Sequence, residues 1–472
     1  MWFYSIELFL VISALFFFFW SLKKEPDTPT LESLAPFWGL VILLAGVMSL
    51  DFRGSFFANT YVLDPFSQWM KVIIGLGYFV TCFISKGIKD IDDRYKAEYF
   101  LFLTTATLGM VVMVSAKDLI TLYTALELSS YSLYLLVPMR KRENLSSEAG
   151  IKYLLVGVAA SGIMIYGFSL LFGLTQTTYL SEIAAKIPDI QMLPVFWLAF
   201  FLSLSGFLFK LSLFPFHAWA PDVYEEGNTQ VIGFISTVSK VAGLAVFIRL
   251  MLLVGNGTEA IQNVWVIIAI LTMTIGNLAA LVQVDLKRLL GYSSIAQAGY
   301  LLVGVLCLTQ KGVSAAIFYI GVYVVMNLTA FFIITQLSKD SRNVSTADVK
   351  GLYKRNPLLA LTLMVSFFSL AGIPPLAGFT GKWFIFSAAI NEGYSLLAII
   401  AIANSIASLY YYLMIVKNAY SDEEAPSLEP ITLKPSYKFL CYSSMVFLAV
   451  CGFFPGWLMS FAKQSIALFF AF

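Results

Sequence analysis

The sequence predicts an all-α integral membrane protein with about fourteen transmembrane helices, two of them broken. Of its 472 residues, 59% are hydrophobic and only 12% are charged, and the mean hydropathy is +0.82. No soluble domain of this size exposes so apolar a composition to water. Apolar runs of about 17 to 25 residues recur along the chain, and each is long enough to cross roughly 30 Å of hydrocarbon as a helix.

We expect one polytopic membrane domain over residues 1–472, because no long polar segment separates the apolar runs. The last run is interrupted at Gly452 and Pro455, so either one long helix or a helix followed by a re-entrant segment fits it. The expected spans are 3–21, 35–50, 66–85, 98–115, 119–138, 150–175, 193–215, 231–254, 262–283, 288–308, 312–337, 357–390, 396–416 and 437–471.

Basic residues are unevenly distributed over the loops between these spans. Loops after odd-numbered spans carry many, such as Lys86, Lys89 and Arg94, whereas loops after even-numbered spans carry few, such as Lys117 and Lys311. The positive-inside rule therefore predicts cytoplasmic odd-numbered loops and an amino terminus on the outer side. No basic stretch precedes the first apolar run, so we expect an anchor there and not a cleaved signal.

Proline interrupts the seventh and twelfth spans in a similar way, at Pro215 and at Pro374-Pro375. Interrupted segments in corresponding positions are typical of repeat transporters. The correspondence predicts a first repeat over about 98–254 and a second over about 262–417. Because the repeats are offset by five spans, they should be inverted in the membrane. Backbone groups released at each break need protein or water as partners, so a polar site is expected near each.

Four of the ionisable side chains inside or beside these spans are candidates for an ion pathway. Glu127 and Lys240 lie near the middle of theirs, whereas Lys210 precedes the first break and Lys382 follows the second. A charge at this depth costs about 3 kcal/mol on insertion scales and by default marks an ion pathway. A lysine removed from water holds its proton less tightly, and a nearby carboxylate strengthens that hold. We therefore interpret the four residues as a proton-translocation route.

Other positions have two interpretations each. His217 either relays protons or hydrogen-bonds the backbone released at the break, and Lys152 is either an interfacial anchor or a proton-uptake residue; both are candidate auxiliary positions. Asp118 fits helix capping, and Arg249 fits snorkelling from a span end. The main alternative for all buried charges is a structural ion pair.

The residue types exclude several kinds of site. All four cysteines lie in apolar runs, and His217 is the single histidine, so we expect no metal, haem or iron–sulfur site in this chain. The stretch Gly378 to Lys382 (GFTGK) does not meet the phosphate-loop pattern, and no nucleotide is expected. The net charge of +2 is spread over loops, which argues against nucleic-acid binding.

At these same residues the chain resembles a known family, the antiporter-like membrane subunits of respiratory complex I, shared with multisubunit cation/proton antiporters. The motifs that carry the resemblance are Asp118 to Leu136 (DLITLYTALELSSYSLYLL), Leu208 to Glu225 (LFKLSLFPFHAWAPDVYE), Lys240, Leu286 to Tyr300 (LKRLLGYSSIAQAGY) and Ala371 to Phe386 (AGIPPLAGFTGKWFIF). Within the family it looks most like the N-type subunits, since M-type subunits typically have glutamate in place of Lys382 and L-type subunits are longer.

The resemblance implies a fourteen-helix fold with inverted five-helix repeats and a proton-translocating role in NADH-quinone oxidoreductase of the bacterial inner membrane. It implies that Glu127 and Lys210 form the coupled pair of one half-channel, that Lys240 carries the proton centrally, and that Lys382 serves the other half. Partners would be the other membrane-arm subunits and the lipid bilayer. NADH, FMN, iron–sulfur clusters and quinone would be bound by other subunits.

The chain departs from the family pattern after Glu225, where Glu226-Gly-Asn-Thr-Gln230 replaces a proline-containing stretch. A milder break at the start of the eighth span is therefore expected. Two other functions stay open: a subunit of a Na⁺/H⁺ antiporter or hydrogenase-type complex, and a scaffold whose buried charges only hold helices together.

Overall fold

The computed structural model describes residues 5–23, 27–141, 143–255, 257–338, 342–421 and 429–470, with backbone alone at 143 and 144. Up to residue 254 the elements are α1 (Ser5–Ser21), α2 (Thr28–Met48), β1 (Gly54–Phe56), β2 (Tyr61–Leu63), α3 (Pro65–Ile84), η2 (Asp93–Tyr95), α4 (Lys96–Ser115), α5 (Leu119–Leu136), η3 (Val137–Met139), α6 (Glu143–Thr175), α7 (Leu180–Ile190), α8 (Pro194–Leu211), α9 (Trp219–Glu226), α10 (Thr229–Phe234), the π-helix η4 (Ile235–Ser239) and α11 (Lys240–Val254).

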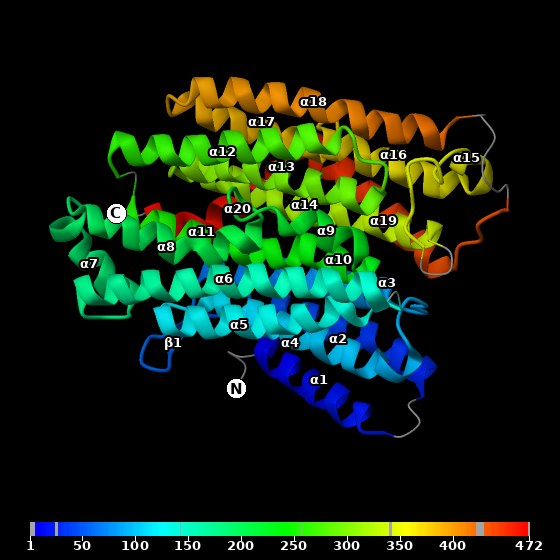
Figure 1. Ribbon diagram of the computed structural model, residues 1–472, viewed down its shortest axis with the longest axis horizontal. Coiled ribbons are helices and arrows are strands. Elements are labelled where there is room, and N and C mark those ends of the chain that lie inside the picture. Colours follow the sequence, from blue (N-terminus) through cyan, green and yellow to red (C-terminus); the bar gives the residue numbers. More distant parts are fainter. Residues whose placement is uncertain are drawn as a thin grey trace. The chain divides into compact units, whose positions relative to one another are not determined.

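The remaining elements are α12 (Glu259–Ala280), α13 (Leu286–Leu306), α14 (Gln310–Leu337), α15 (Leu352–Arg355), α16 (Pro357–Ala371), α17 (Ala377–Asn391), α18 (Ser395–Ala419), α19 (Pro435–Phe453), α20 (Gly456–Ile466) and η5 (Ala467–Phe470). The helices follow one another along the chain in Figure 1.

The helices match the apolar runs of the sequence. In the described part of the chain, twelve helical segments are long and apolar enough to cross a bilayer, and two shorter apolar helices, α1 and α16, account for the other expected spans. The run at 357–390 is interrupted between α16 and α17. The run at 437–471 is not one long helix, because α19 ends before Pro455 and α20 begins after it. The amphipathic helix α7, in a polar stretch, was not expected.

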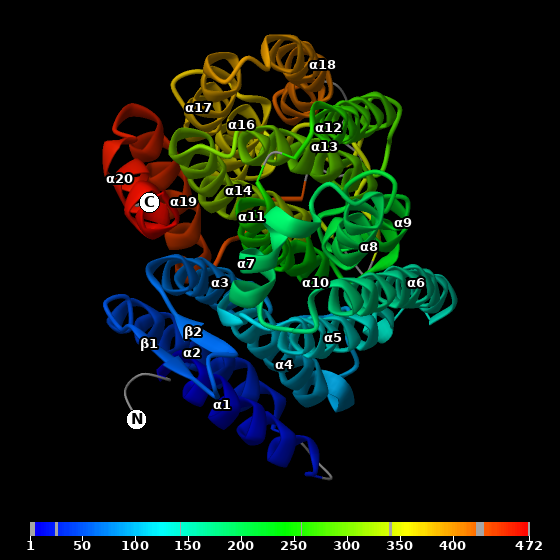
Figure 2. The ribbon, with the colours of Figure 1, turned by 90° about the vertical axis from the view of Figure 1, so that its left-hand side faces the viewer.

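The contacts of the chain divide it into two compact units. Unit 1 comprises residues 1–219 and 238–261, and unit 2 comprises 220–237 and 262–472. In unit 1, α4 packs along α5, α6 along α8, and α11 against α8, α3 and α4. The helices α1 to α3 and the β1–β2 hairpin lie beside α4, as the blue segments of Figure 2 show. Unit 1 thus combines the three helices α1 to α3 with most of the first expected repeat, whose residues 220–237 belong to unit 2.

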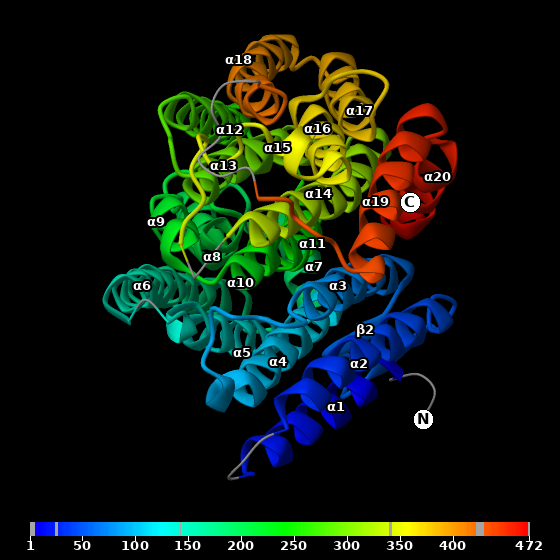
Figure 3. The same ribbon diagram turned by 90° about the vertical axis from the view of Figure 1, so that its right-hand side faces the viewer.

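In unit 2, α14 is the central helix. It contacts α10, α13, α16, α17, α19 and α20, and almost all of its side chains are buried. Figure 3 shows α14 beside α13, α16 and α17, with α19 and α20 in red. The helix α18 covers α16 and α17.

The two units share local features at matching positions. A Cβ on Gly109 of α4 would lie 2.6 Å from the Ser129 nitrogen of α5, and one on Gly276 of α12 would lie 2.6 Å from the Ala296 nitrogen of α13. Each close approach lets two helix backbones touch. Both glycines precede their partner residue by the same number of positions. In each unit, the glycine therefore fixes how a helix pair packs.

The caps of these helices match as well. Asp118 accepts a hydrogen bond from the Thr121 amide at the start of α5 (2.9 Å), and Asp285 accepts one from the Arg288 amide at the start of α13 (2.8 Å). The capping role expected for Asp118 is confirmed. Each aspartate also forms an isolated antiparallel bridge to a later segment, Tyr179 in unit 1 and Ser345 in unit 2.

An ion-pair cluster ties α3 to α11 in unit 1. The Arg249 guanidinium donates to both carboxylate oxygens of Asp64 (2.8 and 3.3 Å) and to the Val114 carbonyl (3.0 Å). Lys117 lies 3.6 Å from Asp64. Arg249 is only 3% exposed, so the expectation that it snorkels is wrong. It is a buried ion-pair partner, because α3 brings a carboxylate within its reach.

We predict that replacing Gly109 by valine destabilises unit 1. The added side chain would meet the backbone of Ser129 and push α4 from α5; such overpacking typically costs about 1–3 kcal/mol. Thermal unfolding of the purified chain in mild detergent measures the effect. Gly162→Val in α6 is the matched control, because no atom lies within 4 Å of a Cβ there. Equal midpoints for the two variants would contradict the prediction.

A second prediction concerns Lys117, in the loop between α4 and α5. Burial lowers its pKa to about 8, repulsion by Arg249 adds to this, and attraction by Asp64 opposes it. At pH 7.5 about a quarter of Lys117 is then neutral, against roughly 0.1% for a solvated lysine. Amine-directed acetylation followed by mass spectrometry should show Lys117 labelling half-maximal near pH 8, with exposed Lys311 as the reference. Asp64→Asn should shift this midpoint lower; a midpoint near pH 10 would contradict the prediction.

Candidate functional site

Glu127 lies on α5, two turns after its Asp118 cap, and is 7% exposed. Neither of its carboxylate oxygens has a hydrogen-bond partner among the described residues. Buried polar groups in proteins are normally paired, and an exception requires an explanation. This carboxylate has both oxygens available to accept a proton or a water hydrogen.

Lys210 lies beside Glu127. Its side chain is buried, and its ammonium donates to the Ser129 hydroxyl of α5 at 3.1 Å, two residues from Glu127. Glu127 is within electrostatic range of Lys210. The helix α8 is held in place because the Ser205 hydroxyl donates to the Ala160 carbonyl of α6 (2.7 Å). The structure thus places the Lys210 ammonium within electrostatic range of Glu127 and in a hydrogen bond to the helix that carries Glu127.

The chain breaks two residues after Lys210. Ser212 adopts a left-handed conformation (φ 57°), and the Leu213 amide returns to the Leu208 carbonyl at 2.9 Å. The indole of Trp219 closes the loop by donating to the Phe209 carbonyl (3.3 Å) and the Phe216 carbonyl (3.1 Å). The first expected break is therefore an ordered turn.

The two auxiliary candidates occupy different environments. His217, in the loop after the break, is half-buried and hydrogen-bonds the backbone at Pro215, as one of its two interpretations predicts. Lys152 is exposed on α6 and pairs with Glu148 one turn earlier (2.9 Å). That contact fits an interfacial anchor better than a buried proton site.

Lys240 is the first residue of α11 and is 1% exposed. The π-helix Ile235–Ser239 precedes it directly. π-helical turns are rare and frequently mark functional sites, because they disturb the regular backbone hydrogen bonding. The sequence analysis did not predict this turn. Upstream, Asn228 caps α10 by accepting from the Gln230 and Val231 amides, where the family has prolines.

Lys240 and Lys210 lie on neighbouring helices in unit 1. Gly243, one turn after Lys240, packs against Lys210: a Cβ there would lie 3.3 Å from the Lys210 Cβ. The helices α5, α8 and α11 thus bring Glu127, Lys210 and Lys240 into one buried region of unit 1. Lys382 belongs to unit 2.

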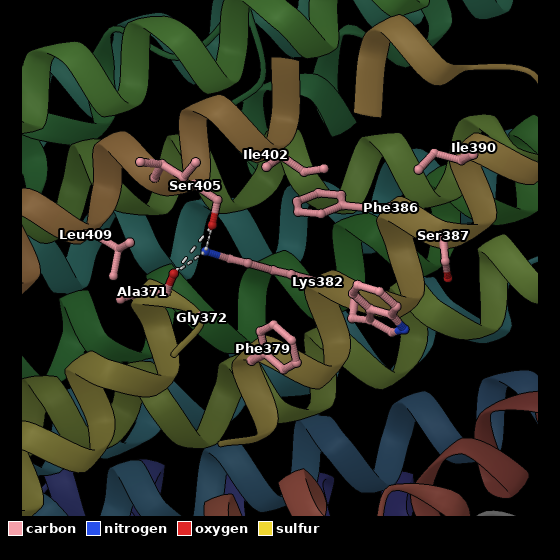
Figure 4. Close-up of a pocket in the computed structure, with 12 residues that line it drawn as sticks. Ala371, Gly372, Phe379, Lys382, Phe386, Ser387, Ile390, Ile402, Ser405 and Leu409 are labelled. Carbon is pink, nitrogen blue, oxygen red and sulfur yellow. Dashed lines mark hydrogen bonds between the residues drawn. The ribbon is translucent and has the colours of Figure 1, made fainter. Parts of the chain in front are cut away.

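Lys382 on α17 reaches back to the second break. Its ammonium donates to the carbonyls of Leu370 (3.0 Å) and Ala371 (3.2 Å) and to the Ser405 hydroxyl of α18 (3.0 Å). Figure 4 shows the side chain extended toward Ala371 and Ser405. Three acceptors meet the three hydrogens of an ammonium. The carbonyls are the last of α16, where a cation is stabilised by the helix dipole.

A cavity of about 310 Å³ opens beside Lys382. Its wall is mostly apolar and includes Phe379, Trp383 and Phe386, with Ser387 and Ser405 as polar members. The ammonium also lies 4.7 Å from the ring centroid of Tyr300, a cation–π contact.

A buried polar network that the sequence analysis did not identify meets Lys382 at the Leu370 carbonyl. The Gln297 amide of α13 donates to that carbonyl (3.2 Å) and to the Tyr412 hydroxyl (3.4 Å), while Tyr319 donates to the Gln297 carbonyl oxygen. Ser293 bonds Tyr412. The signal was present, because serine and glutamine inside an apolar span need partners.

A second group of polar side chains in unit 2 surrounds Asn327 on α14. Its amide donates to the Ser236 hydroxyl in the π-helical turn (2.8 Å) and to the Tyr323 hydroxyl (3.0 Å). Ser294, the α13 residue that matches Glu127 by position, bonds the Tyr224 hydroxyl at 3.3 Å. Where unit 1 has a carboxylate, unit 2 has a hydroxyl in a neutral network.

Residues 116–408 match the family described as "NADH:quinone oxidoreductase/Mrp antiporter, TM". The chain is 41% identical over 462 residues to a NADH-quinone oxidoreductase subunit N 2 of Syntrophobacter fumaroxidans, with 98% of each chain covered. It is 38% identical over 438 residues to a subunit N of Heliobacterium modesticaldum, with 92% of each covered.

Comparison with solved structures shows that the fold is also similar to that of complex I and Mrp membrane subunits. A chain of respiratory complex I from Thermus thermophilus aligns with a TM-score of 0.84 at 29% identity, covering 98% of this chain and all of that one. A chain of the Mrp complex from a Dietzia species aligns with a TM-score of 0.86 at 21% identity, covering 99% and 97%, which shows a shared fold.

We predict that Lys382→Met loosens the second break. The substitution removes one donor from each of two helix-end carbonyls. Gln297 still donates to Leu370 and Ser405 to Ala371, so the expected cost is about 1 kcal/mol for each lost hydrogen bond. Hydrogen exchange of the Gly372 and Ile373 amides, which bond to Phe368, should become faster. Lys382→Arg keeps the donors and should exchange more slowly than the methionine variant, and Ser387→Ala in the same cavity is the control. Unchanged exchange in Lys382→Met would show that the lysine does not hold the break.

Proposed function

The chain belongs to the N-subunit family of NADH-quinone oxidoreductase, within the membrane family shared with Mrp antiporters, and we propose that it carries protons through the membrane arm of that enzyme. The observation that carries the proposal is the buried group of Glu127, Lys210 and Lys240 in unit 1. Ionisable residues at this depth are costly and are retained where ions move.

In this mechanism Glu127 and Lys210 exchange one proton. Lys210 donates to the Ser129 hydroxyl, and Glu127 lies within electrostatic range of the ammonium, so water between the two groups would pass the proton from the amine to the carboxylate. The transfer turns an ammonium and a carboxylate into a neutral amine and a neutral acid. It removes a positive charge from beside α11 and makes it easier for Lys240 to hold a proton, because like charges in a low dielectric repel.

We assign Lys240 the central position and Lys382 the proton site of unit 2. The π-helical turn before Lys240 supports this role, because it interrupts regular backbone bonding where a mobile proton needs partners. A proton would enter or leave the site of Lys382 beside the Leu370 carbonyl. The residues that line this route are Gln297, Tyr319 and Tyr412. His217 and Lys152 have supporting roles outside the buried group.

We further propose two inverted repeats, at about 98–254 and 262–417. The matching caps at Asp118 and Asp285, the matching close approaches at Gly109 and Gly276, and the matching helix ends at Ser212 and Gly372 support the repeats. The loop charges support an amino terminus on the outer side of a bacterial inner membrane.

The partners in this proposal are neighbouring membrane-arm subunits, and the redox cofactors belong to other subunits. An Mrp-type antiporter subunit is the alternative. Mild detergent extraction separates the two, because co-purifying flavin and iron–sulfur subunits identify the redox enzyme and their consistent absence identifies an antiporter.

We predict that Lys240→Met and Glu127→Gln each reduce proton pumping per electron to less than half in inside-out vesicles that contain the assembled complex. Each variant removes one proton-binding group without removing a redox centre. Proton uptake during NADH oxidation and the amount of assembled complex are measured together. Lys311→Met, at an exposed position, is the control. Normal pumping at normal assembly in both variants would refute the function, and lost assembly before lost pumping would favour the scaffold.

A further inference from the structure

A second buried cluster of ionisable groups lies in unit 1, away from Glu127. Lys71 on α3 is fully buried, and its ammonium lies 2.7 Å from Oε1 of Glu7 on α1 and 2.9 Å from the hydroxyl of Tyr61 on β2. The Tyr61 hydroxyl donates to the same Glu7 oxygen. Glu7 and Tyr61 are 9% and 5% exposed. In the sequence, Glu7 and Lys71 are each the one charged residue of an apolar run.

The bonding of Glu7 is one-sided. Both donors converge on Oε1, and Oε2 is buried without a hydrogen-bond partner in the described part of the chain. The carboxylates that serve as structural anchors differ. Asp64 uses one oxygen for the Ser67 amide and Arg249 and the other for Arg249 and Lys117. Glu127 of the proposed proton site also has buried carboxylate oxygens without a hydrogen-bond partner among the described residues.

Other charged groups connect this cluster to the surface. Asp64 and Arg249 are within electrostatic range of Lys71. Lys117, which lies against Asp64, has a side chain that is 27% exposed. The backbones are linked too, because the Lys117 amide donates to the Thr60 carbonyl, next to Tyr61. Charged side chains at the start of α3 and in the α4–α5 loop thus continue from Lys71 toward the partly exposed Lys117.

The cluster also lies close to Lys240 along the helix axes. The helices α3 and α11 are in contact at both ends of this stretch, through Gly77 with Val238 and through Asp64 with Arg249. Counted from the Gly77–Val238 contact, Lys71 is six residues along α3 and Lys240 is two residues along α11. At about 1.5 Å per residue, the two lysines are therefore about 6 Å apart along the helix axes. Lys71 of the Glu7–Lys71 pair therefore lies on a helix that packs directly against the helix that carries Lys240.

We propose that Glu7, held by Tyr61 and Lys71, is a proton-binding site at the loop end of unit 1, which faces outward in the predicted orientation. A hydronium ion from the outer water gives one proton to Oε2 and leaves as water. The carboxylate becomes a neutral acid, and Lys71 loses the negative charge that balances its ammonium. The inference rests on the proposed proton translocation, whose pumped proton this site would exchange with the outside.

The test uses the assembled complex in vesicles and two variants of Glu7. Glu7→Gln keeps the shape and a hydrogen-bonding oxygen but binds no proton. The double variant Glu7→Gln with Lys71→Met removes the pair as a whole, which a structural ion pair tolerates. Proton pumping per electron and pH-difference infrared spectra of protonated carboxyl groups are recorded for both, with Asp64→Asn as the spectroscopic control.

We expect Glu7→Gln to assemble normally, to lose one carboxyl band in the infrared difference spectrum, and to pump at least twofold less per electron. The double variant should not regain pumping. An unchanged infrared spectrum in Glu7→Gln, or restored pumping in the double variant, would overturn the site and leave a structural ion pair. If Lys240→Met abolishes pumping while Glu7→Gln does not alter it, only this inference fails. Normal pumping in Lys240→Met would instead refute the proposed function.

Discussion

The structure depends on one constraint: hydrocarbon offers no hydrogen bonds, so every charge and every released backbone group inside it needs a partner from the protein or from water. Most of the chain meets this constraint with continuous helices. Where it breaks them, at Ser212 and Gly372, the break lies beside a lysine. Two of the buried lysines, Lys210 and Lys382, therefore belong to the same sites as the helix breaks.

The two units meet the constraint differently although their local geometry matches. In unit 1 the amine precedes the break and turns to the Ser129 hydroxyl beside Glu127. In unit 2 the amine follows the break and turns back to the carbonyls of α16, with Gln297 as a second donor. Unit 1 therefore has a carboxylate within electrostatic range of its lysine, whereas the lysine of unit 2 bonds neutral groups.

The fold could be predicted because span length and proline breaks act locally. The apolar runs, the interruptions and the capping role of Asp118 all follow from neighbouring residues. Contacts between distant residues could not be predicted. Arg249 was assigned to snorkelling because nothing nearby in the sequence announces Asp64, and the π-helical turn before Lys240 has no local signal.

The site was predictable to the same degree. Glu127 and Lys210 were each identified because an apolar span makes a charge conspicuous, whereas their pairing was implied by the family resemblance. The structure places the two groups within electrostatic range through α5 and α8. Gln297 and the Glu7–Lys71 pair were missed because their meaning depends on which partners the packing provides. A polar residue inside a span indicates that a hydrogen-bond or ion-pair partner is needed, but the tertiary structure determines which residue provides it.

The three contacts of Lys382 have a mechanical consequence. An ammonium supplies three hydrogens, but a neutral amine supplies only two, and the structure has three acceptors waiting: two carbonyls at the end of α16 and the Ser405 hydroxyl. When a proton leaves Lys382, one of the three hydrogen bonds that connect α17 to α16 and α18 is therefore also lost. Loss of the proton and loss of one hydrogen bond then occur together. The rigidity of this helix junction therefore depends on whether Lys382 is protonated.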